Sequence, residues 1–189
     1  MGQKVLRSEL LDYVTWSERK SSVYAQVRAA KAVRRIHVGE TLTFLFENAQ
    51  TVRYQIQEMM RVEKIVKEAD IEHELTTYNE LIGGPGEMGC VLLIEIPDPD
   101  RRDVLLKKWL RLPYHLYVKF EDGTRVGASF DERQIGETRL SSVQYLKFDT
   151  SGRMPVAIGC DLEEYCHENT LTAEQAVALQ ADLVDPANA

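Results

Sequence analysis

The chain of 189 residues has few cysteines and no long apolar run. Its three cysteines, Cys90, Cys160 and Cys166, are an odd number without paired spacing, so we expect free thiols in a reducing compartment. No segment approaches the roughly 18 consecutive apolar residues of a membrane span, and the first residues lack the apolar stretch of a secretory signal. We therefore predict a cytoplasmic protein that does not enter a membrane.

Basic residues are fewer than acidic ones, and the net charge is −7. This charge weighs against broad attraction to nucleic acid or anionic lipid. Segment 19–35 is an exception, because it contains no acid but six bases: Arg19, Lys20, Arg28, Lys31, Arg34 and Arg35. The simplest interpretation is a solvated helix face whose last cations favour the negative end of the helix dipole. A surface for an anion or a partner is the alternative.

The common catalytic motifs are missing as well. The chain has no Gly-x-Ser-x-Gly elbow and no Cys-x-x-Cys pair. The glycine-rich segment 83–89 lacks a final Gly-Lys-Ser/Thr and precedes a predicted strand, so it does not match a phosphate-binding loop. Cys160 and Cys166 fit none of the close zinc spacings, and Cys166 with its neighbour His167 would need a third group to act as nucleophile and base.

A metal site is a weak alternative. Six side chains have suitable ligand atoms, namely Glu47, Glu58, Glu63, Asp70, His73 and Glu74. Asp70 and His73 share one helical face. A di-iron bundle, however, needs a Glu-x-x-His pair on each of two helices, and this chain has no second such pair. We predict no metal and no other cofactor.

Apolar periodicity and turn residues predict an α+β fold. Helices are expected from Ser8 to about Ile36, over 52–66, from Glu68 to Leu81, after a cap at Asp98, and from a cap at Thr172 to Val184. Strands are expected over 41–47, 88–96, 116–120, 126–130 and 143–148, with an edge strand over 155–160. The result is a mainly antiparallel β-sheet of five or six strands covered by helices, with an N-terminal helical segment. We expect a single domain over 1–184 and a frayed tail over 185–189.

Segment 52–66 can be read in two ways. Val52, Tyr54 and Ile56 alternate with polar residues, as in a strand. Over the longer window the apolar residues fall within one arc of about 160° on a helical wheel, which favours a helix. On that helix Glu63 lies in the middle of the apolar arc and Gln55 lies inside it. A carboxylate among apolar side chains must be paired, hydrogen-bonded or neutralised, because an unpaired buried charge costs several kcal/mol.

Three interpretations of these polar residues stay open. In the first, Glu63 forms an internal ion pair with Arg34, Arg35 or Arg139, while Gln55 ties backbone groups together. In the second, a pocket binds a polar ligand. Its candidate residues are Glu47, Asn48, Gln55, Arg61 and Glu63. In the third, the segment is not a helix and these side chains are solvated.

Several blocks of the chain resemble a known family. The blocks TLTFLFENAQTVRYQIQEMMRVEKI, HELTTYNELI, LLIEIPDPDRR and DERQIGETRLSSVQYLKF are similar to those of a bacterial family defined only as a domain of unknown function. The resemblance runs from about Leu10 to Leu183. Members tend to carry His-Pro-x-Tyr near the last strand, where this chain has Leu162-Glu163-Glu164-Tyr165. If that histidine has a role in the family, it is missing here.

The resemblance implies an association and no reaction. Family members are often encoded beside rubrerythrin-like and iron–sulfur oxidoreductase proteins. This implies an accessory role in redox or oxidative-stress metabolism, with a protein of such a system as partner, or association between copies of the chain. Our first hypothesis is an accessory or binding protein. The alternative is an enzyme or a small-ligand-binding protein with a polar site around Glu63.

Overall fold

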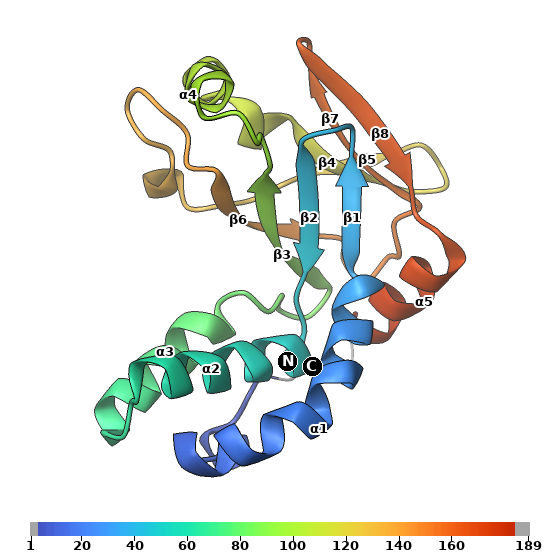
Figure 1. Ribbon diagram of the computed structural model, residues 1–189. Helices are drawn as coiled ribbons and strands as arrows, with labels where there is room; N and C mark the ends of the chain where they lie inside the picture. The colour runs from blue at the N-terminus through green and yellow to red at the C-terminus, as the bar shows by residue number, and fades with distance from the viewer. Residues whose placement is uncertain (1–3, 184–189) are drawn as a thin grey trace.

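The computed structural model describes residues 4–183, and Figure 1 shows their arrangement. The helices are α1 (Tyr13–Ala32), α2 (Ala49–Glu63), α3 (Glu68–Asn79), α4 (Pro99–Lys108) and α5 (Ala173–Asp182), with short 3-10 turns η1 (Arg7–Glu9), η2 (Leu112–His115) and η3 (Glu132–Gln134). The strands are β1 (Arg35–Val38), β2 (Leu42–Phe46), β3 (Glu87–Ile94), β4 (Leu116–Lys119), β5 (Arg125–Gly127), β6 (Val143–Asp149), β7 (Ala157–Leu162) and β8 (Tyr165–Thr170).

The strands form two antiparallel sheets, which confirms the predicted α+β class. Among the described residues the first sheet has the order β1-β2-β3-β6 and the second has the order β5-β4-β7-β8. The arrangement therefore differs from the expected one sheet of five or six strands. β8 was not expected because its side chains are mostly exposed and polar, and only its pairing with β7 defines it. For the same reason β7 is an inner strand and not the predicted edge.

The two sheets face each other and approach at both margins. On one side Ser129, which follows β5, forms a bridge with Lys147 of β6. On the other side β1 lies against β8, where the Tyr165 hydroxyl donates to the carbonyl of Val38 at 2.9 Å and accepts from the amide of Thr41 at 2.8 Å. The inner faces share one apolar core, which includes Phe44, Phe148, Leu92, Leu116 and Ile158. The strands thus enclose a single core from two sides.

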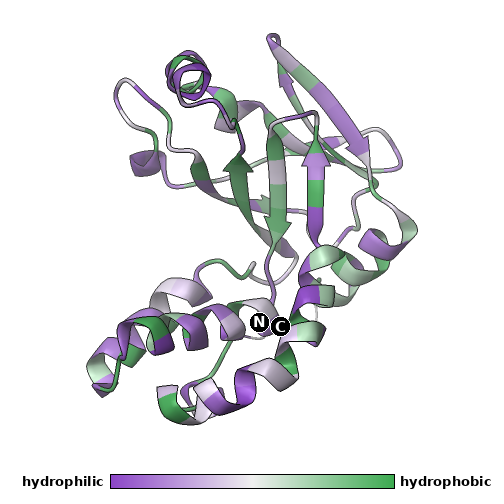
Figure 2. Cartoon of the chain, in the orientation of Figure 1, coloured by the Kyte–Doolittle hydropathy of each residue, from purple (hydrophilic) through white to green (hydrophobic). Residues whose placement is uncertain are grey.

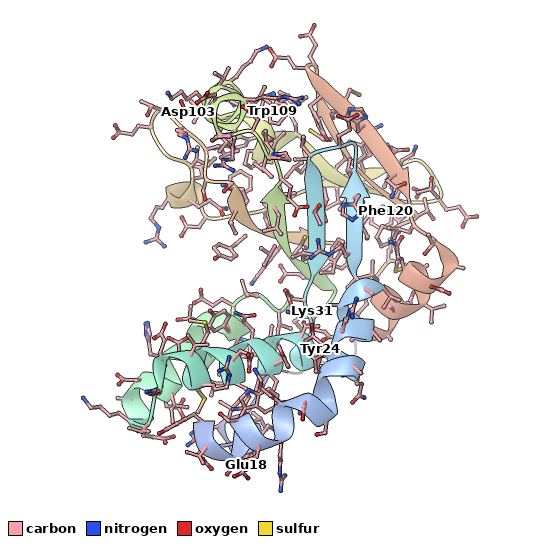
Figure 3. All side chains as sticks on the ribbon, viewed as in Figure 1. Glu18, Tyr24, Lys31, Asp103, Trp109 and Phe120 are labelled. Carbon is pink, nitrogen blue, oxygen red and sulfur yellow. The ribbon has the colours of Figure 1, made fainter. Side chains whose placement is uncertain are left out.

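Helices α1, α2 and α3 extend from one end of the sheets (Figure 1). They bury a second apolar cluster, which consists of Val5, Leu10, Val52, Ile56, Met60, Ile71, Leu75 and Ile82. Helix α4 covers the opposite end, where Figure 3 labels Asp103 and Trp109. Figure 2 shows the contrast in hydropathy, since β2 and β3 are largely hydrophobic whereas the helices mix both kinds of residue. Within the described chain, every helix is too short or too polar to span a bilayer.

Helix ends follow local sequence signals in most places. Asp98, Asn48 and Thr172 cap α4, α2 and α5 through side-chain bonds to backbone amides, as expected for α4 and α5. The first helix differs from its prediction: Asp12 caps it instead of Ser8, and it ends at Ala32 because the residues from Arg35 pair with β2. The single domain over 1–184 stays a prediction, and the expected tail over 185–189 lies outside the described residues.

Candidate functional site

A polar junction forms where β2 leads into α2. Asn48 Oδ1 accepts a hydrogen bond from the amide of Thr51 at 3.0 Å, and Thr51 Oγ1 accepts one from the amide of Asn48 at 3.0 Å. The same hydroxyl contacts Glu47 Oε2 as a donor. This reciprocal cap fixes the first turn of α2 and holds the Glu47 carboxylate at the end of the sheet.

Glu47 and Asn48 line a cleft of about 300 Å³ between the strand ends, the loop before β3 and the end of α5. Its lining residues are Phe46, Glu47, Asn48, Ala49, Gln50, Ile82, Gly83, Glu87, Met88, Gly89, Leu179, Ala181 and Asp182. Gly83 and Gly89 suit this position because a Cβ at either one would collide with backbone atoms less than 3 Å away. The cleft therefore lies between the ends of the strands and the helices α2 and α5.

The carboxyl group of Glu47 is the unusual feature of this cleft. Burial raises its pKa, while the Thr51 hydroxyl and the nearby charges of Lys31 and Arg34 oppose that rise. Lys31 lies in the last turn of α1, close to the junction of α1, α2 and β1 (Figure 3). Within residues 4–183 the hydrogen bond to this carboxyl comes from Thr51 and reaches Oε2, so Oε1 accepts none. This half-buried carboxyl thus keeps one oxygen open at the cleft.

A second acid at the cleft, Asp182, is held by a network of hydrogen bonds. Arg34 donates from Nε to Asp182 Oδ2 at 2.6 Å and from Nη2 to Oδ1 at 2.9 Å. Asn48 Nδ2 also donates to Oδ1 at 2.9 Å. Arg34 is only 8% exposed, and it also donates to the carbonyls of Ala30 and Ala178. The network holds α5 against the start of α2, and Asp182 neutralises the charge of the buried arginine.

The expected burial of Glu63 is wrong. Glu63 is exposed, and so are Val62 at 62% and Val66 at 70%. The helix ends at Glu63 because Lys64 adopts a left-handed conformation, with φ at 53°, and turns the chain. Ile65 then packs against the helical cluster in place of the last turn. Within residues 4–183 no element covers Glu63, so its carboxylate is solvated and needs no partner.

The expected partners of Glu63 lie elsewhere. Arg34 pairs with Asp182, and Arg139 donates to Asp103 Oδ1 at 3.0 Å. Arg35 is exposed on β1. The ligand-binding role predicted for Glu63 stays untested, but it has lost its physical basis.

The carboxylate that α2 does enclose belongs to Glu58. It accepts hydrogen bonds from Trp16 Nε1 at 2.7 Å and from Arg61 Nε and Nη2 at 3.1 and 3.0 Å, and Lys20 lies 3.3 Å away. The Arg61 hydrogen bonds, above all, lower the pKa of Glu58 to about 2. Arg61, a predicted site residue, therefore forms an ion pair within α2, and Trp16 and Lys20 join the same carboxylate to α1.

Gln55 and its neighbour Gln57 have different surroundings. Gln55 is half-buried beside the Tyr78 hydroxyl; burial raises the pKa of Tyr78, and Gln55 opposes the rise. Gln57 is the amide that ties backbone groups together, since it accepts from the amide of Leu11 at 2.7 Å and donates to its carbonyl at 2.9 Å. The five predicted residues therefore separate: Glu47 and Asn48 share the cleft, whereas Gln55, Arg61 and Glu63 lie along α2 away from it.

The alternative sites assemble no metal cluster. Glu63, Asp70, His73 and Glu74 line a shallow hollow at the free end of α2 and α3. No group of three or more His, Cys, Asp or Glu side chains that could hold a metal ion occurs within residues 4–183. Cys160 is buried and Cys166 exposed on separate strands, and both are free thiols, as is the buried Cys90.

The structural interactions of Asp182, Glu58 and Gln57 were not predicted from the sequence. The Arg34–Asp182 pair joins residues 148 positions apart, so no local sequence pattern predicts it. Glu58 lies at 20% side-chain exposure on the flank of the apolar arc, where it meets α1. The spacing of Glu58 and Arg61 at i,i+3 was a usable signal for a helix pair.

These features define an α+β protein with two facing antiparallel sheets, three projecting helices and a polar cleft at their junction. Comparison with family models places the chain in a family: it belongs to "Protein of unknown function (DUF3501)", whose model matches residues 4–183. This confirms the resemblance inferred from the sequence blocks. Tyr165, at the end of the segment Leu162-Glu163-Glu164-Tyr165, ties β8 to β1, and Leu162 packs against the larger core.

The chain is also similar to a solved structure. The crystal structure of a novel protein of unknown function from Burkholderia pseudomallei K96243 matches with a TM-score of 0.86 and 27% identity, over 96% of this chain and 100% of that one. No curated protein matches the chain.

Proposed function

We propose that this protein is a binding protein that holds a small molecule with a cationic or hydrogen-bond-donating group in the cleft beside Glu47. The observation that carries the proposal is the half-buried Glu47 carboxyl, which lines the cleft and has one oxygen without a hydrogen bond from the described residues. Burial raises its pKa, so its charged form is poorly solvated, and a donor on a bound molecule would complete its hydrogen bonds.

The charge distribution supports the chemical class of the ligand. The titratable residues that line the cleft are acids, namely Glu47, Glu87 and Asp182. Asp182 is paired with Arg34, and Glu87 Oε2 accepts from the amide of Gly84 at 2.9 Å. A ligand with an ammonium, guanidinium or amide donor would meet acceptors, whereas a carboxylate or phosphate would meet like charge. Phe46, Met88 and Leu179 supply apolar contact on the same walls.

A cationic ligand should also change the protonation of Glu47. Burial favours the neutral carboxylic acid, and a cation placed against it would favour the carboxylate. Binding would therefore release a proton, and affinity would rise with pH through the titration of Glu47. A neutral donor would show a weaker dependence, because its hydrogen bond also favours the carboxylate but brings no opposite charge.

A thermal-shift screen tests the proposal. Purified protein is heated with a panel of amines, guanidines, amides and carboxylates, alongside the variants Glu47→Gln and Glu63→Gln. We expect at least one cationic or donor compound to stabilise the wild type and the exposed-site control Glu63→Gln, but not Glu47→Gln. Equal stabilisation of all three proteins, or a preference for carboxylates, would contradict the proposal.

The raised pKa of Glu47 also supports a second candidate, an enzyme that uses this carboxyl as a general acid or base. Catalytic carboxyls are commonly shifted upward by burial in a cleft. The two functions differ in one measurement: turnover of a ligand found in the screen, followed by mass spectrometry, supports the enzyme, and recovery of the unchanged compound supports the binding protein.

We further propose that the protein serves a redox or oxidative-stress system, with a rubrerythrin-like or iron–sulfur protein as partner. The support is family association, and the described contacts add nothing to it. Deletion of the gene should sensitise the host to peroxide, and the wild-type gene should restore resistance better than Glu47→Gln. Equal resistance with and without the gene would contradict this role.

A further inference from the structure

A side-chain amide takes the place of a strand at the outer edge of β6. The amide of Tyr145 donates to Gln134 Oε1 at 2.7 Å, and Gln134 Nε2 donates to the carbonyl of Tyr145 at 3.0 Å. This is the donor and acceptor pair that a neighbouring strand would supply. Two residues further along β6, a true backbone pair follows, with Ser129 and Lys147 bonded at 2.7 and 2.8 Å. The chain leaves the edge of β6 after Ser129. The side chain of Gln134 then occupies the position beside Tyr145 at which a continued strand would have paired.

The side chain of Gln134 can leave the edge of β6 while the surrounding backbone stays in place. Turn η3 buries no residue, and Asp131 pairs locally with Arg133. The anchors of the segment lie on either side of the turn: Phe130 and Ile135 pack against the larger core, and the buried Leu140 donates its amide to the carbonyl of Leu106 at 2.9 Å. Rotation of the half-buried Gln134 side chain is therefore the change that frees the backbone of Tyr145.

The exposed edge would open onto a groove of about 930 Å³ between α3 and β6. Tyr78 and Leu81 of the α3 side and Phe130 and Tyr145 of the sheet side are among its lining residues. Tyr145 is 55% exposed although it is aromatic. Lys147, on the same face of β6, forms no ion pair with the described residues, whereas Arg133 is paired. The groove thus combines aromatic walls with an uncompensated cation, Lys147, on its sheet side and an exposed acid, Glu80, on its α3 side.

We propose that the edge of β6 binds an extended peptide segment of a partner protein. The peptide backbone replaces the Gln134 amide at Tyr145 and adds a strand to the first sheet. An aromatic or branched side chain of the peptide packs between Tyr78 and Tyr145, and a carboxylate of the peptide pairs with Lys147. Gln134 protects the edge in the absence of the partner, as natural proteins protect other open strand edges.

The test uses fluorescein-labelled synthetic peptides of nine residues in fluorescence anisotropy. The parent peptide alternates Val and Thr and has a central Tyr with Glu two residues on either side. One analogue is N-methylated at alternate backbone amides, and another has Lys in place of Glu. We expect the parent to bind, the N-methylated analogue to lose binding, and the Lys analogue to bind at least tenfold more weakly.

Variants of the protein sharpen the test. Gln134→Ala removes the competing amide and should raise affinity for the parent about tenfold, whereas the exposed-helix control Gln26→Ala should not change it. Lys147→Glu should reverse the preference between the Glu and Lys peptides. Glu47→Gln should bind the parent like the wild type, which keeps this proposal separate from the cleft.

Several outcomes would overturn the proposal. These are binding of the N-methylated peptide equal to the parent, no binding by the parent, or no gain in a folded Gln134→Ala variant. Self-association of Gln134→Ala without peptide binding would assign the edge to a second copy of the chain instead. The melting temperature of each variant is measured beside the anisotropy, and Lys147→Glu supplies the test if Gln134→Ala does not fold.

Discussion

Both ends of α2 place polar side chains next to apolar ones, but other elements surround only the first end. At the first end, Glu47 and Asn48 meet the sheets and α5: Asn48 bonds to Asp182, which pairs with Arg34, and Glu47 accepts a hydrogen bond from Thr51 and lines the cleft. At the other end, Glu63 lies on the apolar side of the helical wheel and is nevertheless exposed. Periodicity shows which face of a helix can be buried. Burial itself depends on which other elements reach that part of the helix.

The largest effect on the free energy of unfolding should come from breaking the Arg34–Asp182 ion pair at the junction. Arg34→Ala should lower the free energy of unfolding by about 3 kcal/mol, because Asp182 loses its partner and a buried side chain is removed. Its neighbour Arg35 is exposed, so Arg35→Ala is the matched control and should change stability by less than about 0.5 kcal/mol. Urea denaturation of both variants measures the difference. Equal losses would show that the junction contributes no special stability.

The Glu58 network should give the next effect. Glu58→Gln should cost about 2 kcal/mol at neutral pH, since the hydrogen bonds from Arg61 and Trp16 lose a charged acceptor. The pKa of Glu58 is lowered to about 2 from 4.5, so its stabilisation is present above pH 4.5 and is lost as the pH falls toward 2. Melting temperatures of wild type and variant should therefore converge in acid. A constant gap across that range would contradict the assignment.

A smaller effect of opposite sign is expected at Glu47. Its pKa is raised, so the stability it contributes is present at low pH and is lost as the pH rises through its titration in the folded protein. Glu47→Gln removes that loss and should be neutral or stabilising by less than about 1 kcal/mol at pH 7. Differential scanning calorimetry from acid to neutral pH checks the sign. Marked destabilisation at pH 7 would mean that Glu47 serves as a structural ion-pair partner.

The smallest effect should occur at the free end of α2. Glu63→Gln should change the free energy of unfolding by less than about 0.5 kcal/mol, because the side chain is exposed. Had Glu63 been buried against a cation, the same change would have cost about 1–4 kcal/mol. Chemical denaturation distinguishes the two cases, and a large loss would restore the original sequence argument.

Local signals in the sequence predicted much of the fold. The Asp98 and Thr172 caps, the apolar run of β3 and the period of α2 each depend on residues close together in the chain. The division into two sheets was not predictable, because it depends on the pairing of β7 with both β4 and β8 and on a polar strand. Pairing between distant segments has no local signature.

The candidate site was predicted in part for the same reason. Glu47 is the last residue of a predicted strand, and Asn48 follows it before a predicted helix, so their place at a strand end could be read from the sequence. Their surroundings come from Arg34 and Asp182, and the latter lies 134 positions from Asn48. The pairing of Glu58, the acid that α2 encloses, was not predicted. The apolar arc was drawn from α2 alone and took no account of how α1 packs against it.

The most direct measurement of the central claim is the titration of the Glu47 carboxyl carbon by NMR, with and without a cationic compound selected in the thermal-shift screen. We predict a pKa above the usual range for glutamate in the free protein and a fall in that pKa when the compound binds. An ordinary pKa that does not move on addition of the compound would contradict the assignment of the cleft as a binding site.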